Sequence, residues 1–371
     1  MTPATDKLIV IGTSAGGLDA LKRVLGKLPA DFSAPVLVVM HIGARDSILP
    51  SLLRKVCALQ VRHARDGEHL AQPMILVAPP DRHLTVVRDG PLACVRLATG
   101  PMENYTRPAI DPLFRSAAAA YGAGATGVVL TGYLDDGTAG LQAIKACGGT
   151  AVVQDPQDAF APNMPASALE QVAVDYVLKL DDIGEMLLHL AAAPLPPPTE
   201  EAAMERKPAD VPEWIRIENS YASGGGSLRE LEHIARPSTF TCPECGGALW
   251  ELNGAVGGQA DAAPSPGQEL AAQAPATQQP VQQPAPRTRY RCHTGHSFTA
   301  LALEQTQDRV VEDAVWAAIR ALNEKEELAR RLAAESGTRG LARAEADYEA
   351  RATSAQRAAT VLRETLVREL P

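Results

Sequence analysis

Three continuous apolar runs in the first half of the chain each end on side chains that can do chemistry. The runs and the residues that follow them are 8–11 with Ser14, 35–40 with His41, and 127–132 with Asp135 and Asp136. Uninterrupted apolar runs of this length are typical of parallel strands that are buried on both faces. Because such sheets gather their chemistry at the carboxyl ends of the strands, the sequence predicts an α/β fold with these side chains at one edge.

The turn after the first run, residues 12–17, reads Gly-Thr-Ser-Ala-Gly-Gly and should lead into a helix. Small residues let the backbone turn tightly, and the start of a helix presents unpaired N–H groups to an anion. A serine at position 14 could therefore attack a carbonyl while neighbouring amides hold the oxyanion. The turn lacks the G-x-G-x-x-G of dinucleotide sites, and Leu18 stands where a phosphate loop needs lysine.

Several ordered motifs resemble those of one known family. They are residues 12–17, His41, residues 107–114, and residues 130–137 with Gly140. Over about residues 6–192 the chain resembles the CheB family, the chemotaxis receptor methylesterases. The resemblance implies a doubly wound, mainly parallel α/β domain that hydrolyses γ-glutamyl methyl esters on chemoreceptors, while some relatives also deamidate glutamine. It assigns Ser14 as nucleophile, His41 as base and Asp136 as the orienting acid, with no cofactor for catalysis.

The chain departs from the family pattern at three places around this triad. Ala15 replaces a common threonine, Tyr133 replaces a methionine that lines the site, and residues 42–43 are Ile-Gly where methionine and proline are commoner. The triad itself is intact. The departures therefore bear on the substrate more than on the reaction.

Three other residues compete for roles at this site. Asp135 could replace Asp136, although the resemblance favours the residue directly before Gly137. His83 follows a strand-like run and could line the cleft, but a lone histidine of this kind is more often at the surface or in a supporting position. Asp111 precedes a proline and is expected to be a helix N-cap. We expect Ser14 Oγ to face Nε2 of the base, with the acid behind the ring.

Composition limits the partners of this chain of 371 residues. Its hydrophobic content of 46% supports one α/β core of about 190 residues with smaller units. A formal charge of −9 without a basic patch makes nucleic acid an unexpected ligand.

No signal peptide or transmembrane run is evident, so we expect a cytoplasmic protein with no membrane insertion. Ser14 leaves no room for a receiver domain ahead of it, so control by an attached receiver is not expected.

The predicted catalytic domain covers residues 1–192. A linker, residues 193–236, follows it; this segment is rich in proline and glycine and has room for one short helix. A second group of residues suited to chemistry lies beyond the linker. Residues 237–299 contain two knuckles with metal-ligand spacing. The predicted zinc ligands are Cys242, Cys245, Cys292 and His296, with His293 as the alternative fourth ligand. We expect a small structural zinc ribbon.

The ribbon should carry a disordered loop at residues 254–286, which are rich in Ala, Gln, Pro and Gly. The other cysteines, Cys57, Cys94 and Cys147, are scattered through the catalytic domain and are expected in its core. Because a linker separates the ribbon from a domain with its own core, we expect metal removal to unfold the ribbon and leave ester hydrolysis largely intact.

The last part of the chain, residues 300–371, has helical periodicity. Apolar residues recur at helical spacing, as a stripe, from Val311 to Leu322 and again from Leu341 to Leu366, and glycines at positions 337 and 340 separate the two stretches. We expect a helical hairpin or coiled-coil arm that either packs within the molecule or supports self-association.

Three functions compete on these observations. The first is a serine methylesterase that acts on methylated chemoreceptors in chemotaxis-like signalling. The second is the same fold acting on another ester or deamidating glutamine. The third is a catalytically idle signalling adaptor, against which the intact set of Ser14, His41 and Asp136 counts.

Overall fold

The computed structural model describes residues 6–43, 46–90, 92–195, 211–252 and 287–369. The chain forms two compact units, residues 1–302 and residues 303–371. Within the described ranges, none of the helices is both long enough and apolar enough to cross a membrane.

A seven-stranded parallel sheet forms the centre of the first unit, in the order β3-β4-β2-β1-β7-β8-β9. The strands are β1 (Leu8–Thr13), β2 (Val36–Met40), β3 (Val61–His63), β4 (Ile75–Val77), β7 (Ala125–Val129), β8 (Thr150–Gln154) and β9 (Tyr176–Leu178). The strand order reverses at β1, which pairs with β2 on one side and β7 on the other. This doubly wound sheet confirms the predicted fold class, and in such sheets ligands bind at the carboxyl ends of the strands.

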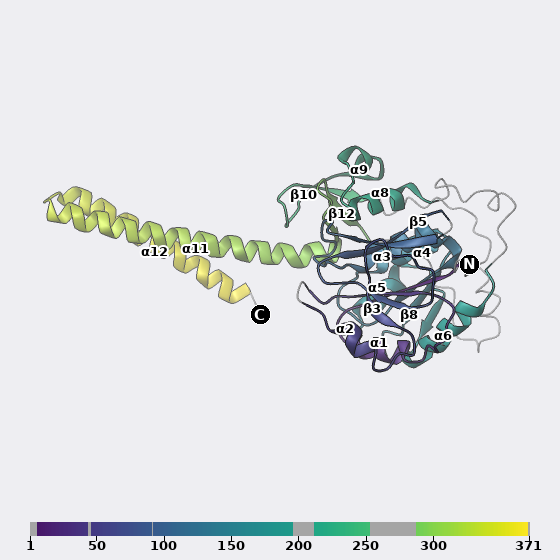
Figure 1. Cartoon of the computed structure of the whole chain (residues 1–371). Helices are drawn as coiled ribbons and strands as arrows, with labels where there is room; N and C mark the ends of the chain where they lie inside the picture. Colours follow the sequence, from purple (N-terminus) through teal and green to yellow (C-terminus); the bar gives the residue numbers. More distant parts are fainter. Residues whose placement is uncertain (1–5, 44–45, 91, 196–210, 253–286, 370–371) are drawn as a thin grey trace. The chain divides into compact units, whose positions relative to one another are not determined.

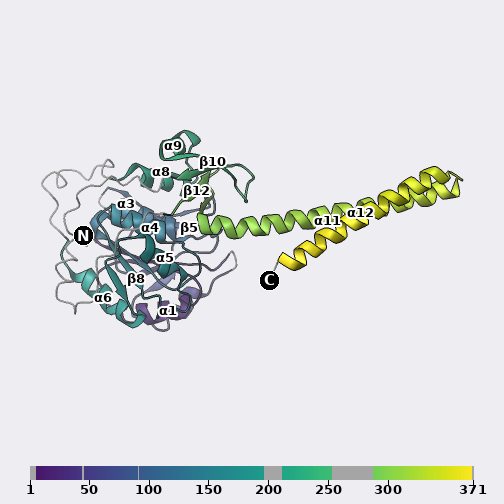
Figure 2. The ribbon, with the colours of Figure 1, turned by 180° about the vertical axis from the view of Figure 1, so that it is seen from behind.

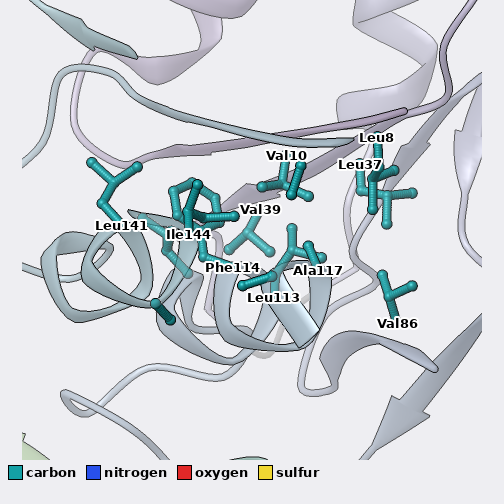
Figure 3. Close-up of a cluster of buried hydrophobic side chains, with 14 of the residues drawn as sticks. Leu8, Val10, Leu37, Val39, Val86, Leu113, Phe114, Ala117, Leu141 and Ile144 are labelled. Atoms are coloured by element: carbon teal, nitrogen blue, oxygen red, sulfur yellow. The ribbon is translucent and has the colours of Figure 1, made fainter. Parts of the chain in front are cut away.

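Helices cover both faces of the sheet (Figures 1 and 2). One face is covered by α1 (Gly17–Leu25), α2 (Leu49–Leu53) and α6 (Leu180–Ala192), and the other by α3 (Ile110–Tyr121), α4 (Thr138–Ala146) and α5 (Asn163–Gln171). Side chains of β1 alternate between the two cores, so that Ile9 and Ile11 pack toward α1 while Leu8 and Val10 pack toward Phe114 of α3 (Figure 3). Burial on both faces explains why the strands read as unbroken apolar runs.

A hairpin of β5 (His83–Asp89) and β6 (Leu92–Ala98) lies against α3 outside the main sheet. The amide of Val86 donates a 3.0 Å hydrogen bond to Ser116 Oγ of that helix. The hairpin covers one side of α3, and α8 also packs on that helix. The short η1 helix (Gly122–Gly124) then leads from α3 into β7.

The described part of the segment predicted as a linker forms two helices, α8 (Glu213–Ala222) and α9 (Leu228–Ile234). Ile215 of α8 is fully buried in the same core cluster as the sheet. Asn219 Nδ2 also donates a 3.4 Å hydrogen bond to the carbonyl of Arg115 in α3. The described part thus has two helices where the sequence predicted a linker with room for one, and α8 has an apolar face that α3 covers.

A four-stranded antiparallel sheet follows, in the order β10-β11-β12-β13. Its strands are β10 (Ala235–Thr241), β11 (Ala248–Leu252), β12 (Arg289–Cys292) and β13 (Ser297–Thr299). We call this sheet with its connecting turns, residues 235–252 and 287–299, the metal-cluster module. The predicted loop at residues 254–286 lies outside the described residues.

The second unit is a helical hairpin. Helix α11 (Ala300–Thr338) begins in the first unit and runs on into the second, where α12 (Ala342–Glu369) returns antiparallel to it. Hydrogen bonds from Arg330 to Gln356 and from Arg363 to Asn323 join the two helices. Buried alanines in both helices allow the close approach; they are Ala329, Ala333, Ala352, Ala355 and Ala359.

Candidate active site

Ser14 follows β1 in a tight turn at the start of α1. Its amide donates a 3.0 Å hydrogen bond to the carbonyl of Thr131, and its carbonyl accepts one of 2.9 Å from the amide of Gly17. Gly16 has a φ of 76°, a conformation that glycine adopts without strain. Gly132 must also be glycine, because a Cβ there would lie 2.9 Å from Ser14 Cβ and 2.1 Å from Met164 Sδ. The local sequence thus holds Ser14 at the carboxyl edge of the sheet.

His41 and Asp136 lie together at the same edge. His41 follows β2, and its amide donates a 3.2 Å hydrogen bond to the carbonyl of Thr13 next to Ser14. The ring atom Nε2 of His41 lies 2.8 Å from Oδ2 of Asp136. The side chain of Asp136 is 2% exposed and that of His41 is 15% exposed. The structure therefore places the predicted base and acid in direct contact at the carboxyl edge of the sheet.

The orientation of the imidazole differs from the expected one. The predicted arrangement turned Nε2 toward Ser14, whereas in the structure Nε2 faces Asp136 and Nδ1 is the nitrogen that remains for the serine. Either ring nitrogen of a neutral imidazole can accept a proton, because the hydrogen bond at the other nitrogen selects the tautomer. Among the described residues no hydrogen bond involves Ser14 Oγ, and such contacts often tighten only when substrate binds.

Asp136 is held as an ion by its neighbours. Burial alone would raise the pKa of its carboxyl group, but the hydrogen bond and charge of His41 and the backbone amides around it outweigh burial and lower the pKa. The amide of Ile110 donates to Oδ2 at 2.7 Å, and the amides of Asp111 and Gly137 donate to Oδ1 at 3.2 and 3.1 Å. An ionised carboxylate in this position can stabilise a protonated imidazole.

Asp111 has a structural role at this site. Its Oδ1 accepts hydrogen bonds from the amides of Gly137, at 3.0 Å, and Gly140, at 2.6 Å. Asp111 therefore caps the start of α4. The sequence predicted that Asp111 would be the N-cap of its own helix, α3, but the N-cap of α3 is Ala109. Burial and the nearby Asp136 carboxylate raise the pKa of Asp111 well above its usual range.

The two other competing residues are also bound by structural contacts. His83 is completely buried, with Nε2 2.9 Å from the carbonyl of Pro101 and Nδ1 accepting a hydrogen bond from the amide of Ala109. Burial lowers the pKa of its imidazole, which favours the neutral form. Asp135 accepts a 2.7 Å hydrogen bond from Thr299 Oγ1 of the metal-cluster module. Among these described residues it is Asp136 that contacts the His41 ring, while His83 and Asp135 bond to other groups.

The four predicted metal ligands also lie together. One ligand atom from each of Cys242, Cys245, Cys292 and His296 lies within 4.8 Å of the others. Cys245 Sγ is 3.8 Å from Cys292 Sγ, and His296 Nδ1 is 3.5 Å from Cys292 Sγ and 3.7 Å from Cys242 Sγ. The alternative ligand His293 is not in this group and packs against Gly247.

Two residues near the triad carried no signal in the sequence. Asn104 Nδ2 lies 3.4 Å from Asp136 Oδ1, and Thr106 Oγ1 lies 3.5 Å from His41 Nε2. Both belong to the loop that directly precedes the 107–114 motif. A polar turn beside a recognised motif is a weak sequence signal, and only the fold brings it to the site.

Comparison with known proteins places this chain in a family. The CheB methylesterase family model matches residues 9–187. A Leptospira interrogans (strain Fiocruz L1-130) protein, provisionally named protein-glutamate methylesterase/protein-glutamine glutaminase, is 43% identical over 183 residues, which cover 49% of this chain and 93% of that protein. The chain belongs to the CheB methylesterase family.

Two further CheB relatives match the same half of the chain. The protein-glutamate methylesterase/protein-glutamine glutaminase 2 of Xanthomonas oryzae pv. oryzae (strain MAFF 311018) is 40% identical over 189 residues, covering 51% of this chain and 52% of that protein. The crystal structure of the Thermotoga maritima CheB methylesterase catalytic domain is 34% identical, with a TM-score of 0.48, and covers 50% of this chain and 98% of that one.

Proposed function

We propose that this CheB family member is a protein-glutamate methylesterase that hydrolyses γ-glutamyl methyl esters on methylated chemoreceptors. The observation that carries the proposal is the 2.8 Å contact between His41 and Asp136 at the strand ends that also present Ser14. A serine hydroxyl is a weak nucleophile at neutral pH and needs such a base beside it. The names of the relatives point to the same reaction class.

In this mechanism Nδ1 of His41 takes the proton from Ser14 Oγ as the oxygen attacks the ester carbonyl. Amides at the start of α1 and around Tyr133 stabilise the tetrahedral oxyanion. The imidazolium then protonates the leaving methoxide, which departs as methanol and leaves a glutamyl ester on Ser14. Water attacks this ester with His41 again as base, and the glutamate carboxylate is released. Asp136 holds the ring and balances its positive charge throughout.

Glutamine deamidation is the second candidate, because the names of the relatives include protein-glutamine glutaminase. The same residues would act on an amide, and ammonia would leave in place of methanol. An idle adaptor remains the third possibility, but a buried carboxylate bonded to a histidine is costly to retain without use. Each of these functions is assigned to the cytoplasm, where the signalling domains of chemoreceptors lie.

The geometry of the cysteine and histidine cluster supports a structural zinc ion. Tetrahedral zinc with Zn–S bonds of about 2.3 Å and a Zn–N bond of about 2.05 Å would place two sulfurs about 3.8 Å apart and a sulfur and a nitrogen about 3.6 Å apart. The contacts within the cluster are 3.8 Å for Cys245 to Cys292 and 3.5 Å for Cys292 to His296. We assign Cys242, Cys245, Cys292 and His296 as its ligands. Catalysis needs no cofactor in this proposal.

The test is release of methanol from methylated receptor by the purified chain. Ser14→Ala should abolish release, and ammonia from a receptor with glutamine at the same sites reports the second activity. A folded Ser14→Ala variant that retains turnover would contradict the serine mechanism. A wild-type chain that releases neither product, and instead binds the receptor, would favour the adaptor.

A further inference from the structure

The loop of residues 101–107 lies between the candidate active site and the metal-cluster module. On the active-site side, Asn104 Nδ2 lies 3.4 Å from Asp136 Oδ1 and Thr106 Oγ1 lies 3.5 Å from His41 Nε2. One loop therefore contacts both members of the His–Asp pair. Whatever holds this loop also affects the position of that pair.

Strand β13 of the module holds the loop as a neighbouring strand would. The amide of Asn104 donates a 2.8 Å hydrogen bond to the carbonyl of Ser297, and the amide of Ser297 donates one of 3.3 Å to the carbonyl of Met102. The amide of Thr299 donates a 3.0 Å hydrogen bond to Asn104 Oδ1. The buried side chain of Asn104 thus accepts from the module with one end and contacts the catalytic carboxylate with the other.

The loop has a backbone conformation that needs external support. Asn104 and Tyr105 have φ values of 49° and 60°, in the left-handed region that side chains disfavour. Such residues cost of the order of 1 kcal/mol each and persist only where the surroundings hold them. The ring of Tyr105 packs on Phe298 of β13, with centroids 4.9 Å apart. The module therefore supplies part of the support.

A buried cluster of charges provides a second link. Glu103 accepts two hydrogen bonds from Arg115 of α3, at 2.7 and 2.8 Å, and one of 3.1 Å from Arg291 of β12. Glu218 of α8 accepts two hydrogen bonds of 2.8 Å from Arg289 and one of 3.1 Å from Arg291. Glu103, Arg115, Glu218 and Arg291 are each at most 1% exposed. Moving the module away would leave buried charges without partners, which is strongly unfavourable.

The metal ligands are adjacent in sequence to these contacts. Cys292 directly follows Arg291, and His296 directly precedes Ser297. The positions of Arg291 and Ser297 therefore depend on the adjacent metal ligands. The stability of the cluster and the conformation of the loop should be coupled for this reason.

We propose that Asn104 is a positioning residue for Asp136, and that the metal-cluster module, by holding Asn104, makes ester hydrolysis depend on the folded state of the module. This inference rests on the proposed esterase function. It reverses the expectation from sequence that loss of the metal leaves hydrolysis intact.

The test is a cycle of four proteins: the full-length wild type, Asn104→Gly, Cys245→Ser, and both changes together. Glycine tolerates the positive φ at position 104, so Asn104→Gly removes the side-chain contacts without straining the backbone. Cys245→Ser removes one thiol ligand at the exposed side of the cluster and should weaken metal binding. Each should lower kcat for methanol release by about 10- to 100-fold with little change in KM, because a displaced catalytic group affects turnover more than binding. Both changes together should cost little more than the larger single loss.

Hydrogen exchange gives a readout that does not depend on activity. In Cys245→Ser, the amide of Asn104 should lose protection while amides of β8 keep theirs. Cys57→Ser with Cys147→Ser is the matched control for thiol loss outside the cluster, and it should keep wild-type kcat and wild-type exchange.

Either of two kinetic results would overturn the inference: wild-type kcat in Cys245→Ser, or losses that multiply in the combined variant. Unchanged exchange at Asn104 in Cys245→Ser would also overturn it, even if the wild type released no methanol. By contrast, failure of the esterase assignment itself would appear as methanol release by the wild type that is absent or unaffected by Ser14→Ala.

Discussion

Thr299 Oγ1 donates a 2.7 Å hydrogen bond to Oδ1 of Asp135, although 164 residues separate them in the chain. The same hydroxyl accepts a 3.1 Å hydrogen bond from the amide of Ala302 at the start of α11. Asp135 directly precedes the carboxylate that contacts His41. The metal-cluster module therefore ends next to the candidate active site, at a carboxyl group that is buried.

We expect Asp135 to reduce stability at neutral pH. Burial raises the pKa of its carboxyl group from 3.8 to about 6, and the bond from Thr299 only partly offsets this. Since the folded state holds the proton more tightly, the cost is absent below about pH 4 and fully present above about pH 6. Asp135→Asn should therefore raise the free energy of unfolding by about 2–3 kcal/mol at pH 7.5 and by much less at pH 4, measured by urea titration. An equal gain at both pH values would contradict this cause.

The two adjacent aspartates should differ sharply in their effect on turnover. Asp136→Asn should lower kcat by about 10⁴-fold, because the amide favours the wrong imidazole tautomer, and His41→Ala should remove nearly all activity. Asp135→Asn is the matched control and should retain activity within a few-fold. Methanol release from methylated receptor measures all three. If Asp135→Asn proved the more damaging change, the assignment of the acid would have to move to Asp135.

Removing one carboxylate from the buried charge cluster should be costly. Burial alone would raise the pKa of Glu218, but three arginines outweigh it and lower the pKa. Glu218→Gln leaves those arginines short of a partner and should lower the free energy of unfolding by about 3–5 kcal/mol at pH 7. The difference in unfolding free energy between the wild type and this variant should fall as the pH drops below the pKa of an unfolded glutamate, because the unfolded wild type then gains a proton. The exposed Glu232→Gln is the control, and chemical denaturation at pH 7 compares the two.

We expect one zinc ion per chain, bound by the cluster of three cysteines and His296. Elemental analysis of the purified chain should find stoichiometric zinc, and Cys292→Ser should lose it. His293→Ala should keep it, since that ring lies outside the cluster. Retention of full zinc by Cys292→Ser, or its loss from His293→Ala, would show that the ligand set is different.

The parallel sheet and the strand-end positions of Ser14, His41 and Asp136 were predictable because they depend on local signals. Apolar runs mark strands buried on both faces, and small residues mark the turns that follow them. The helical hairpin was predictable for the same reason, although the predicted stripe was only partly correct: Ala352, Ala355 and Ala359 are buried, whereas Val311 is 61% exposed.

The sequence by itself thus determined the sheet, the catalytic candidates and the spacing of the metal ligands. Only the tertiary structure decided which nitrogen of His41 meets Asp136, and that Asn104 links the catalytic carboxylate to β13. It also decided that Arg291 and Glu103, 188 residues apart, are buried together. In a sequence these two charged residues cannot be distinguished from charged residues on the surface. An ion is buried only where a partner compensates for its lost hydration, and here that partner is distant in the chain.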